Sequence, residues 1–314
     1  MLVHMQIYVA GHEGLVGRAI TRAIDARGDC TWIGATRDEL DLLDNHAVSQ
    51  FVKTNFPDVI IIAAAKVGGI GANDKFPVEF LLENLGIQNN LISAAHAHSV
   101  KKVIFLGSAC IYPKYCEQPI KEEYLLTGYL EPTNEAYAIA KIAGLKLIQS
   151  YRKEYGHEWI SVMPTNLYGP DDNFDLNTSH VLPAMIVKIH KAKVEMNSAV
   201  ELWGTGKPMR DFLHVDDLAD AVLLLNQKYD DASPINVGTG IDIELARLAA
   251  MIAQIVGFPG EIVWNSQMPD GTPRRVLDIS KISALGWEPK IELADGIRSV
   301  YESYLESQNK HLST

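Results

Sequence analysis

The alternation of short apolar runs with helix-periodic stretches constrains the fold of this chain more than any other feature. Residues 6–10 form an apolar run that ends at Gly11, and apolar residues then recur with helical spacing as far as Gly28. The same pattern predicts strands at 31–35, 59–63, 102–106 and 159–163, and helices at 45–55, 78–97 and 137–155. Continuously apolar strands that alternate with helices form parallel sheets covered on both faces. We therefore predict a doubly wound α/β domain over residues 1–165.

The pattern changes after Pro164, where Gly/Pro turns separate shorter elements. Helices are predicted at 178–192, 215–226, 243–256 and 293–307, and short strands at 200–203, 235–237 and 262–264. We interpret residues 166–314 as a smaller, mixed α/β domain that binds the substrate, although the chain can cross between the two domains more than once. Ligands of doubly wound sheets bind outside the carboxyl ends of the strands. Functional residues are therefore expected in the loops that follow strands.

Charge and composition exclude several classes of partner. The chain carries 28 Lys and Arg against 39 Asp and Glu, a net charge of −11, which repels nucleic acid and anionic lipid. The longest apolar stretch, residues 59–65, is far shorter than the ~20 residues that span a bilayer, and residues 1–5 do not resemble a signal peptide. Cys30, Cys110 and Cys116 form neither a disulfide framework nor a zinc site. We expect a cytoplasmic protein without metal, nucleic-acid or membrane partners.

A glycine motif stands between the first strand and the first helix. Gly11, Gly14 and Gly17 give the pattern G-x-x-G-x-x-G. Such glycines allow a tight turn and a close approach to a pyrophosphate, which the helix N-terminus attracts. The backbone at Leu15 and Val16 would then face the ligand. A tight turn without a ligand is the alternative, but the position after a first strand favours a Rossmann-type dinucleotide site.

The residues after the second strand bear on which dinucleotide is bound. A carboxylate here holds the ribose 2′-hydroxyl of NAD, whereas a basic residue accommodates the 2′-phosphate of NADP. Arg37 therefore favours NADP or NADPH. Asp38 and Glu39 follow directly, and Glu13 lies in the glycine loop. These carboxylates would repel a phosphate, so the preference stays open on the residues alone.

A phenol and an ammonium lie four residues apart in the helix predicted at 137–155. Tyr137 and Lys141 would share one face of it. A neighbouring ammonium favours the phenolate, so we expect Lys141 to lower the pKa of Tyr137 and make it a general acid. Ser108, directly after a predicted strand, would reach the same sheet edge, where its hydroxyl can bond a carbonyl oxygen. A Tyr-x-x-x-Lys pair alone is common on solvated helices; with the glycine loop and Ser108 it indicates a reductase.

These features together resemble the extended short-chain dehydrogenase/reductases. The resemblance narrows in the segments 107–113 (GSACIYP), 132–135 (PTNE), 164–170 (PTNLYGP) and 203–210 (WGTGKPMR), and it covers nearly the whole chain from Gly11 to about Trp287. It points to the branch of the family that converts GDP-4-keto-6-deoxy-D-mannose to GDP-L-fucose. The implied reaction is epimerisation at C3 and C5 followed by NADPH-dependent reduction at C4.

The resemblance also implies roles for individual residues. Inverting C3 and C5 needs a second acid/base pair, and Cys110 and His180 match that pair. The implied catalytic set is Ser108, Cys110, Tyr137, Lys141 and His180. The implied cofactor contacts are Gly11, Gly14, Leu15, Val16, Gly17, Arg37, Asp41, Leu42, Lys141, Pro164, Asn166, Leu167 and His180. The implied substrate contacts, for a diphosphate and guanine, are Lys188, Trp203, Arg210 and Asp270.

Other interpretations of these residues remain open at this stage. Cys110 could be a buried apolar residue and His180 a helix cap, Trp203 could belong to the core, and Arg210 could pair with a nearby aspartate. Another nucleotide-sugar epimerase or dehydratase would share Ser108, Tyr137 and Lys141, but would not need the Cys/His pair. A catalytically silent NADP-binding sensor or scaffold would need only the glycine loop. The family resemblance further implies a homodimer formed by two long helices of each subunit.

Overall fold

A parallel six-stranded sheet forms the centre of the molecule. The computed structural model describes residues 5–312, so residues 1–4, on which the signal-peptide interpretation partly rests, lie outside it. The strand order is β2-β1-β3-β4-β5-β9, and every neighbouring pair is parallel. The strands are β1 (Met5–Ala10), β2 (Cys30–Ile33), β3 (Val59–Ile62), β4 (Lys102–Leu106), β5 (Ile160–Pro164) and β9 (Ile235–Val237). The order reverses between β1 and β3, which is where such sheets bind nucleotides.

Helices cover both faces of this sheet. One face packs on α2 (Asn45–Asn55), α4 (Pro77–Ala97) and α5 (Glu135–Tyr155), and the other on α1 (Leu15–Arg27), α7 (Val215–Lys228) and α9 (Ser280–Ala284). Residues of β1 alternate between the two cores: Tyr8 and Ala10 face the α4 side, and Ile7 and Val9 the α1 side. Burial on both faces explains why the strands are continuously apolar. The predicted doubly wound fold is confirmed.

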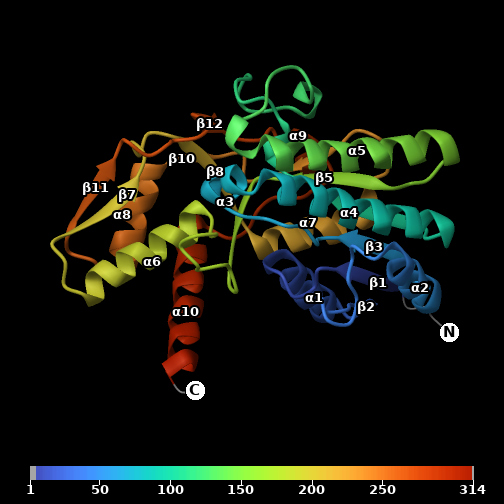
Figure 1. Cartoon of the computed structure of the whole chain (residues 1–314), viewed down its shortest axis with the longest axis horizontal. Coiled ribbons are helices and arrows are strands. Elements are labelled where there is room, and N and C mark those ends of the chain that lie inside the picture. The colour runs from blue at the N-terminus through green and yellow to red at the C-terminus, as the bar shows by residue number, and fades with distance from the viewer. Residues whose placement is uncertain (1–4, 313–314) are drawn as a thin grey trace.

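The remaining C-terminal elements form a third core beside the sheet, at the left of Figure 1. They comprise β6 (Asn166–Tyr168), α6 (Val181–Val194), β7 (Ala199–Trp203), β8 (Met209–His214), β10 (Asp242–Glu244), α8 (Leu245–Val256), β11 (Glu261–Asn265), β12 (Arg274–Arg275) and α10 (Leu293–Leu312), with the short α3 (Ile70–Lys75) nearby in the first half. Strand β8 pairs with β6, β10 and β12, and β7 pairs with β11. The chain crosses back to the main sheet through α7 and β9.

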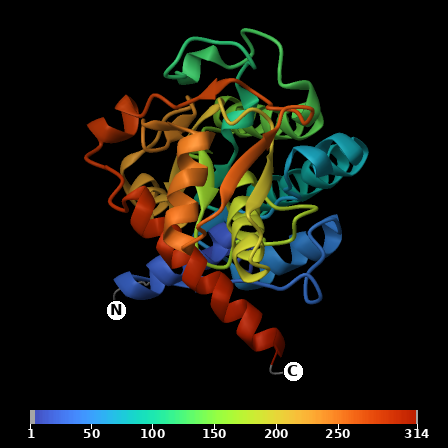
Figure 2. The same cartoon turned by 90° about the vertical axis from the view of Figure 1, so that its left-hand side faces the viewer.

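A long segment projects between β4 and α5. It contains the 3-10 turns η1 (Ala109–Ile111), η2 (Glu122–Tyr124) and η3 (Pro132–Asn134) and stands at the top of the molecule in both views, in green (Figures 1 and 2). Asn236 of β9 fixes it: its Oδ1 accepts from the Tyr112 hydroxyl at 2.6 Å, its backbone N–H donates to Glu122 at 3.0 Å, and its Nδ2 donates to the Ile120 carbonyl at 2.9 Å. The segment is therefore anchored at its base, whereas residues 126–129 are exposed.

Most predicted elements agree with the structure to within a few residues. The helix predicted at 45–55 is α2, and those at 78–97 and 137–155 are α4 and α5 with slightly earlier starts. The prediction missed the short helices α3 and α9 and the strands β6, β8, β10 and β12. These strands have two to six residues, and β8 holds the polar sequence Met-Arg-Asp-Phe-Leu-His, which does not alternate like a surface strand. Among the helices described, none has the length and apolar character needed to cross a membrane.

Candidate functional site

The glycine loop has the shape of a dinucleotide-binding turn. Gly11 has φ of +87°, and a Cβ on Gly17 would lie 2.0 Å from the Gly11 carbonyl oxygen, so the protein's own packing requires both glycines. Gly14 differs because its Cβ would meet only that oxygen, at 3.5 Å, and the residue is exposed at the N-cap of α1. No side chain caps α1, so the first-turn N–H groups near Leu15 and Val16 are available to an anion. The loop therefore fits a pyrophosphate.

Arg37 follows β2 at the same sheet edge. It is exposed, and no hydrogen bond or ion pair engages its side chain within residues 5–312. Glu39 is held by Thr36, whose backbone N–H and hydroxyl donate to its carboxylate at 2.8 and 3.0 Å. These hydrogen bonds lower the pKa of the Glu39 carboxyl and hold its charge at a fixed place, and Glu13 is exposed as well. Arg37 is thus an exposed cation just after β2, with no side-chain partner among the described residues.

The other predicted cofactor contacts are mainly bonded to, or packed against, other parts of the protein. The carboxylate of Asp41 accepts from the Leu43 N–H at 2.9 Å, and the Leu42 carbonyl accepts from Asn90 at 2.9 Å. Pro164 ends β5 and is buried. Asn166 donates to the Asp211 carbonyl at 2.8 Å, and Leu167 packs against the core on the α1 side. These residues follow β2 or β5, at the edge that carries the glycine loop.

Four of the five predicted catalytic residues lie together at the ends of β4 and α5. The Ser108 Oγ accepts from the Cys110 backbone N–H at 3.3 Å. Lys141 is 3 % exposed; its Nζ donates to the Leu106 carbonyl at 2.9 Å and lies 5.8 Å from the centre of the Tyr137 ring. Cys110 is buried and acts electrostatically on both Tyr137 and Lys141. Pairwise contacts thus link a hydroxyl, a thiol, a phenol and an amine at the end of β4 and the start of α5.

The expected effect of Lys141 on Tyr137 is not found. Burial raises the pKa of the Tyr137 phenol, and an ionised Cys110 would raise it further. Burial also lowers the pKa of Lys141 to about 8, because an ammonium is costly to bury. The pKa values of the two groups therefore shift in the directions that favour the neutral phenol and the neutral amine. At neutral pH Tyr137 carries its proton, which suits a group that donates a proton to oxygen.

His180 stands on a different element, which contacts the other four residues only through intermediate residues. It is the N-cap residue of α6, it is solvent-accessible, and its side chain makes no cap hydrogen bond, so the simple capping interpretation does not hold. Surrounding protein lowers the pKa of its imidazole. Gly69 N–H donates to the Thr178 carbonyl at 3.0 Å, and a Cβ on Gly68 would meet the Phe80 ring at 3.1 Å. Phe80 in turn packs edge-on against Tyr137.

Two predicted substrate residues form an exposed pair. Trp203, the last residue of β7, is 51 % exposed, so it does not belong to the core. The Lys188 Nζ of α6 lies 5.1 Å from the centre of its ring, a cation–π geometry. Burial lowers the pKa of Lys188, which Glu201 partly opposes. A flat apolar ring with a cation above it can hold a base or ribose beside a phosphate.

Arg210 and Asp270 have different surroundings. Arg210 is 9 % exposed, and its guanidinium donates to the carbonyls of Met209 at 2.9 Å and Asp270 at 3.4 Å. It forms no ion pair with a nearby aspartate among the described residues. The Asp270 carboxylate instead accepts from the N–H and hydroxyl of Thr205, at 2.7 and 2.8 Å. Asp270 therefore holds the turn beside Trp203, and Arg210 is a buried cation bonded to backbone carbonyls.

Sequence reasoning assigned no role to several residues of this region. Arg275 of β12 is in register with Arg210 of β8 and donates to Thr272 at 3.0 Å. Buried Glu131 pairs with Lys114 at 3.0 Å. Arg275 directly precedes a buried strand-like segment, but only the fold brings it beside Arg210, because the two residues are far apart in sequence. The double-glycine segment after β3 was a usable signal for Gly68 and Gly69.

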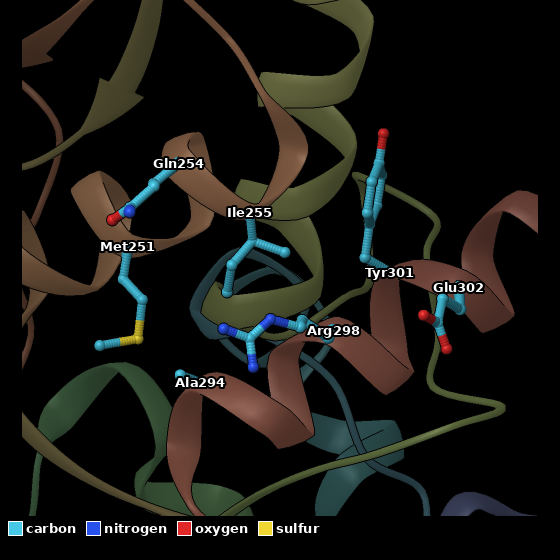
Figure 3. A pocket seen from close by; sticks show the side chains of 7 residues that line it. All are labelled: Met251, Gln254, Ile255, Ala294, Arg298, Tyr301 and Glu302. Atoms are coloured by element: carbon cyan, nitrogen blue, oxygen red, sulfur yellow. The ribbon is translucent and has the colours of Figure 1, made fainter.

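The cavity shown in Figure 3 lies elsewhere. It measures about 480 Å³ between α8 and α10 and contains none of the predicted site residues. Met251 and Ile255 of α8 and Arg298 of α10 project into it. It is open to solvent and lined by both apolar and polar side chains, away from the sheet edge that carries the predicted site residues. Within the described part of the chain, no group of three or more His, Cys, Asp or Glu side chains is arranged to hold a metal ion.

Comparison with known proteins defines the class. The sequence profile of the NAD dependent epimerase/dehydratase family matches residues 7–238, and the chain belongs to this family. Within it, the chain is 51 % identical over 302 residues to putative GDP-L-fucose synthase 2 of Arabidopsis thaliana, covering 96 % of this chain and 92 % of that protein. It is 48 % identical over 314 residues to the GDP-L-fucose synthase of Escherichia coli strain K12, covering 97 % and 98 %. The resemblance stated from the motifs is confirmed.

Solved structures agree with this placement. A GDP-6-OMe-4-keto-L-xylo-heptose reductase from C. jejuni is 39 % identical with a TM-score of 0.93, covering 98 % of this chain and 99 % of that one. A GDP-L-fucose synthetase from Naegleria fowleri, solved with NADP bound, is 29 % identical with a TM-score of 0.89, covering 97 % and 95 %. The relatives therefore share a fold and a GDP-sugar chemistry but differ in the sugar.

Proposed function

We propose that this enzyme converts GDP-4-keto-6-deoxy-D-mannose to GDP-L-fucose, by epimerisation at C3 and C5 and NADPH-dependent reduction at C4. The observation that carries the proposal is that Ser108, Cys110, Tyr137 and Lys141 are linked by pairwise contacts at the sheet edge that also carries the glycine loop. Similarity to GDP-L-fucose synthases over nearly the whole chain supports the choice of substrate. In this scheme residues 1–165 mainly hold the cofactor and residues 166–314 mainly hold the substrate.

The cofactor residues would act through backbone and charge. The first turn of α1, with Gly14 at its N-cap, would hold the pyrophosphate, and Arg37 would meet the 2′-phosphate. Lys141 and Asn166 would lie near the nicotinamide end by family resemblance. When bound, NADPH supplies the hydride that reduces C4.

The protein's own residues would move the protons. Ser108 and Tyr137 would hydrogen-bond the C4 keto oxygen, which stabilises the enolate formed when a proton leaves C3 or C5. Cys110 and His180 would exchange those protons on opposite faces of the ring. For reduction, Tyr137 donates its proton to the C4 oxygen; its raised pKa keeps it protonated for this step. Lys188, Trp203 and Arg210 would receive the diphosphate and base, while Asp270 shapes the turn beside them.

Isotope incorporation tests the proposal. Purified protein is supplied with NADPH and GDP-4-keto-6-deoxy-mannose in heavy water, and the product is analysed by NMR. We expect NADPH oxidation together with deuterium at both C3 and C5. A Cys110→Ser variant should lose most of the incorporation. Oxidation without deuterium at either carbon would contradict the proposal.

That same outcome defines the second candidate function. The chain is also similar, at 39 % identity and a TM-score of 0.93, to a protein described as a reductase of a GDP-4-keto-heptose. A C4 reductase would use Ser108, Tyr137 and Lys141 and would not require proton exchange by Cys110 and His180. The heavy-water experiment separates the two functions in one measurement.

The assembly and location are further parts of the proposal. We propose a homodimer that acts in the cytoplasm. Helices α4 and α5 lie side by side (Figure 1), and Val78 and Leu82 of α4 and Ile139 of α5 are 66 %, 61 % and 44 % exposed. Apolar side chains exposed on two adjacent long helices favour contact with another copy. Sedimentation equilibrium of the full chain measures the state, and a monomer at micromolar concentration would contradict it.

A further inference from the structure

The glycine segment after β3 touches the stretch of chain that leads to His180. The Gly69 N–H donates to the Thr178 carbonyl at 3.0 Å, two residues before the imidazole. The other hydrogen bonds of residues 172–179 stay inside this stretch, as when the Thr178 N–H donates to the Asp175 carbonyl at 3.0 Å. Within residues 5–312, the Gly69 bond is therefore the one hydrogen bond that holds this stretch from outside.

Residue 69 has no room for a side chain. A Cβ on Gly69 would lie 2.6 Å from the Ser179 carbonyl oxygen. The Gly69 φ of −66° is open to any residue, so the requirement for glycine comes from space and not from the backbone conformation. The opposing oxygen belongs to the main chain and cannot rotate away as the end of a side chain would. A larger residue at position 69 would therefore displace the backbone next to His180.

The glycine segment is itself fixed at two points. The side-chain amide of Asn73, which is 6 % exposed, donates to the Gly68 and Gly69 carbonyls at 2.7 and 3.1 Å. Asn84 of α4 accepts from the Lys66 N–H and donates to the Lys66 carbonyl, both at 3.0 Å. The Thr178 carbonyl therefore meets a donor whose own place is set by α3 and α4.

The same segment touches the surroundings of Tyr137. A Cβ on Gly68 would lie 3.1 Å from the Phe80 ring, and Phe80 packs edge-on against Tyr137 with the ring centroids 6.4 Å apart. Helix α3, which follows the two glycines, contacts η3, and η3 leads directly into α5. One short segment therefore lies in contact with both the stretch before His180 and the residues around the phenol.

We propose that Gly69 is a positioning residue, whose backbone contact with Thr178 and Ser179 sets the place of His180 for proton return at C3 and C5. This rests on the proposed function. In the step, the protonated ring of His180 gives its proton to carbon, the electron pair of the enolate forms the new C–H bond, and the neutral imidazole regains a proton from solvent. Inversion requires this proton to arrive on the face opposite the one it left, so the place of the ring matters.

Two alanine variants of neighbouring glycines test the proposal. Gly69→Ala and Gly71→Ala are each supplied with NADPH and GDP-4-keto-6-deoxy-mannose in heavy water, and the products are analysed by NMR. Gly71 of α3 is the matched control, because it is exposed and an added Cβ would meet no atom within 4 Å. A misplacement of ~1 Å can cost about 100-fold in rate, and relief of the contact at residue 69 needs a smaller shift. We therefore expect Gly69→Ala to lower deuterium incorporation at C3 and C5 about tenfold, and Gly71→Ala to match the unmodified protein.

The ratio of products separates positioning from stability. In the proposed scheme, reduction at C4 does not use His180, so sugar that has not been inverted is still reduced. The share of reduced sugar that keeps the starting configuration at C3 or C5 should therefore rise in Gly69→Ala. Partial unfolding would lower all products together and leave their ratio unchanged. An unchanged ratio in the folded variant overturns the proposal.

A second variant covers the case in which Gly69→Ala does not fold, judged by circular dichroism. Asn73→Ala removes the two amide bonds to the glycine carbonyls without adding volume. The same product ratio then decides. A rise supports the proposal, and a ratio equal to that of Gly71→Ala overturns it.

A titration without sugar keeps this proposal distinguishable from the proposed function. The pKa of the His180 imidazole is measured by NMR, and its signal is identified by its loss in His180→Gln. Surrounding protein lowers this pKa, so displacement of the ring toward water in Gly69→Ala should raise it, whereas Gly71→Ala should leave it unchanged. If the unmodified protein incorporates no deuterium, the proposed function fails and the titration alone decides. Equal pKa values in the two variants would then overturn the role of Gly69.

Discussion

The glycine loop and the cluster around Cys110 lie at the same edge of one sheet, yet they are built in opposite ways. The loop consists of backbone: Gly14 is exposed, and its neighbours leave room beside it. The cluster consists of enclosed side chains, in which Lys141 and Cys110 are 3 % and 4 % exposed. Adding a side chain to the loop should therefore impair packing or cofactor binding. In the cluster, removing a charge or a proton donor should impair the reaction. Three predictions test this difference.

The largest effect is expected from Tyr137→Phe in the cluster. The substitution removes one hydroxyl and keeps the ring that packs against Phe80. Loss of a general acid costs about 10²–10⁴ in rate, so NADPH oxidation should fall at least 100-fold in stopped-flow absorbance. Some deuterium exchange at C3 and C5 should remain, because Cys110 and His180 are intact. Reduction at more than a tenth of the normal rate would remove Tyr137 from the scheme.

The next effect compares two glycines of the loop. In Gly17→Ala the new Cβ would lie 2.0 Å from the Gly11 carbonyl oxygen, whereas in Gly14→Ala the nearest atom is 3.5 Å away. Forced overpacking costs about 1–3 kcal/mol, so Gly17→Ala should lower the free energy of unfolding by that amount in urea titrations.

Gly14→Ala serves as the matched variant. It should unfold normally but bind NADPH about tenfold more weakly in fluorescence titration, since the methyl group would occupy the approach to the helix N-terminus. Equal stability of the two alanine variants would show that the loop is not packed as described.

The smallest effect concerns pH. Lys141 has a pKa of about 8 in the folded chain against 10.5 for the free side chain. Below pH 8 it is charged in both states and its burial costs stability. Between pH 8 and 10.5 only the unfolded chain keeps the proton, so this contribution to stability rises with pH. Reduction should decline as pH rises through about 8, because the ammonium charge is lost.

Lys141→Met provides the control for both pH effects. In this variant the slope of unfolding free energy between pH 8 and 10 should become less positive, as measured by urea titration at each pH. A rate of reduction that does not change between pH 7 and 9 in the unmodified enzyme would contradict the lowered pKa.

The strands of the sheet were predicted well from the sequence because they are buried on both faces. A short, continuous apolar run such as 59–62 is typical of such a strand. It missed β8 and β12, which carry the polar residues Arg210 and Arg275 and are only six and two residues long. The motif residues Ser108, Tyr137 and Lys141 were found from spacing and strand position.

Two features of the site required coordinates. The pKa expectation for Tyr137 was wrong because spacing along a helix places two groups on one face but does not reveal how far they are buried; here burial outweighs the neighbouring amine. Arg275 could not be assigned a role from the sequence, because no local pattern connects it to the predicted site residues, which lie far from it in the chain.

Asn236 holds together three parts of the chain that are distant in sequence. Its amide and backbone bind the Tyr112 hydroxyl, Glu122 and the Ile120 carbonyl, and it also donates to the Asp278 carbonyl at 3.2 Å, shortly after β12. One fully buried side chain thus ties the segment after Cys110, the last strand of the sheet and the stretch after Arg275 into a single rigid joint. Removing this one side chain would therefore remove hydrogen bonds from three distant parts of the chain at once.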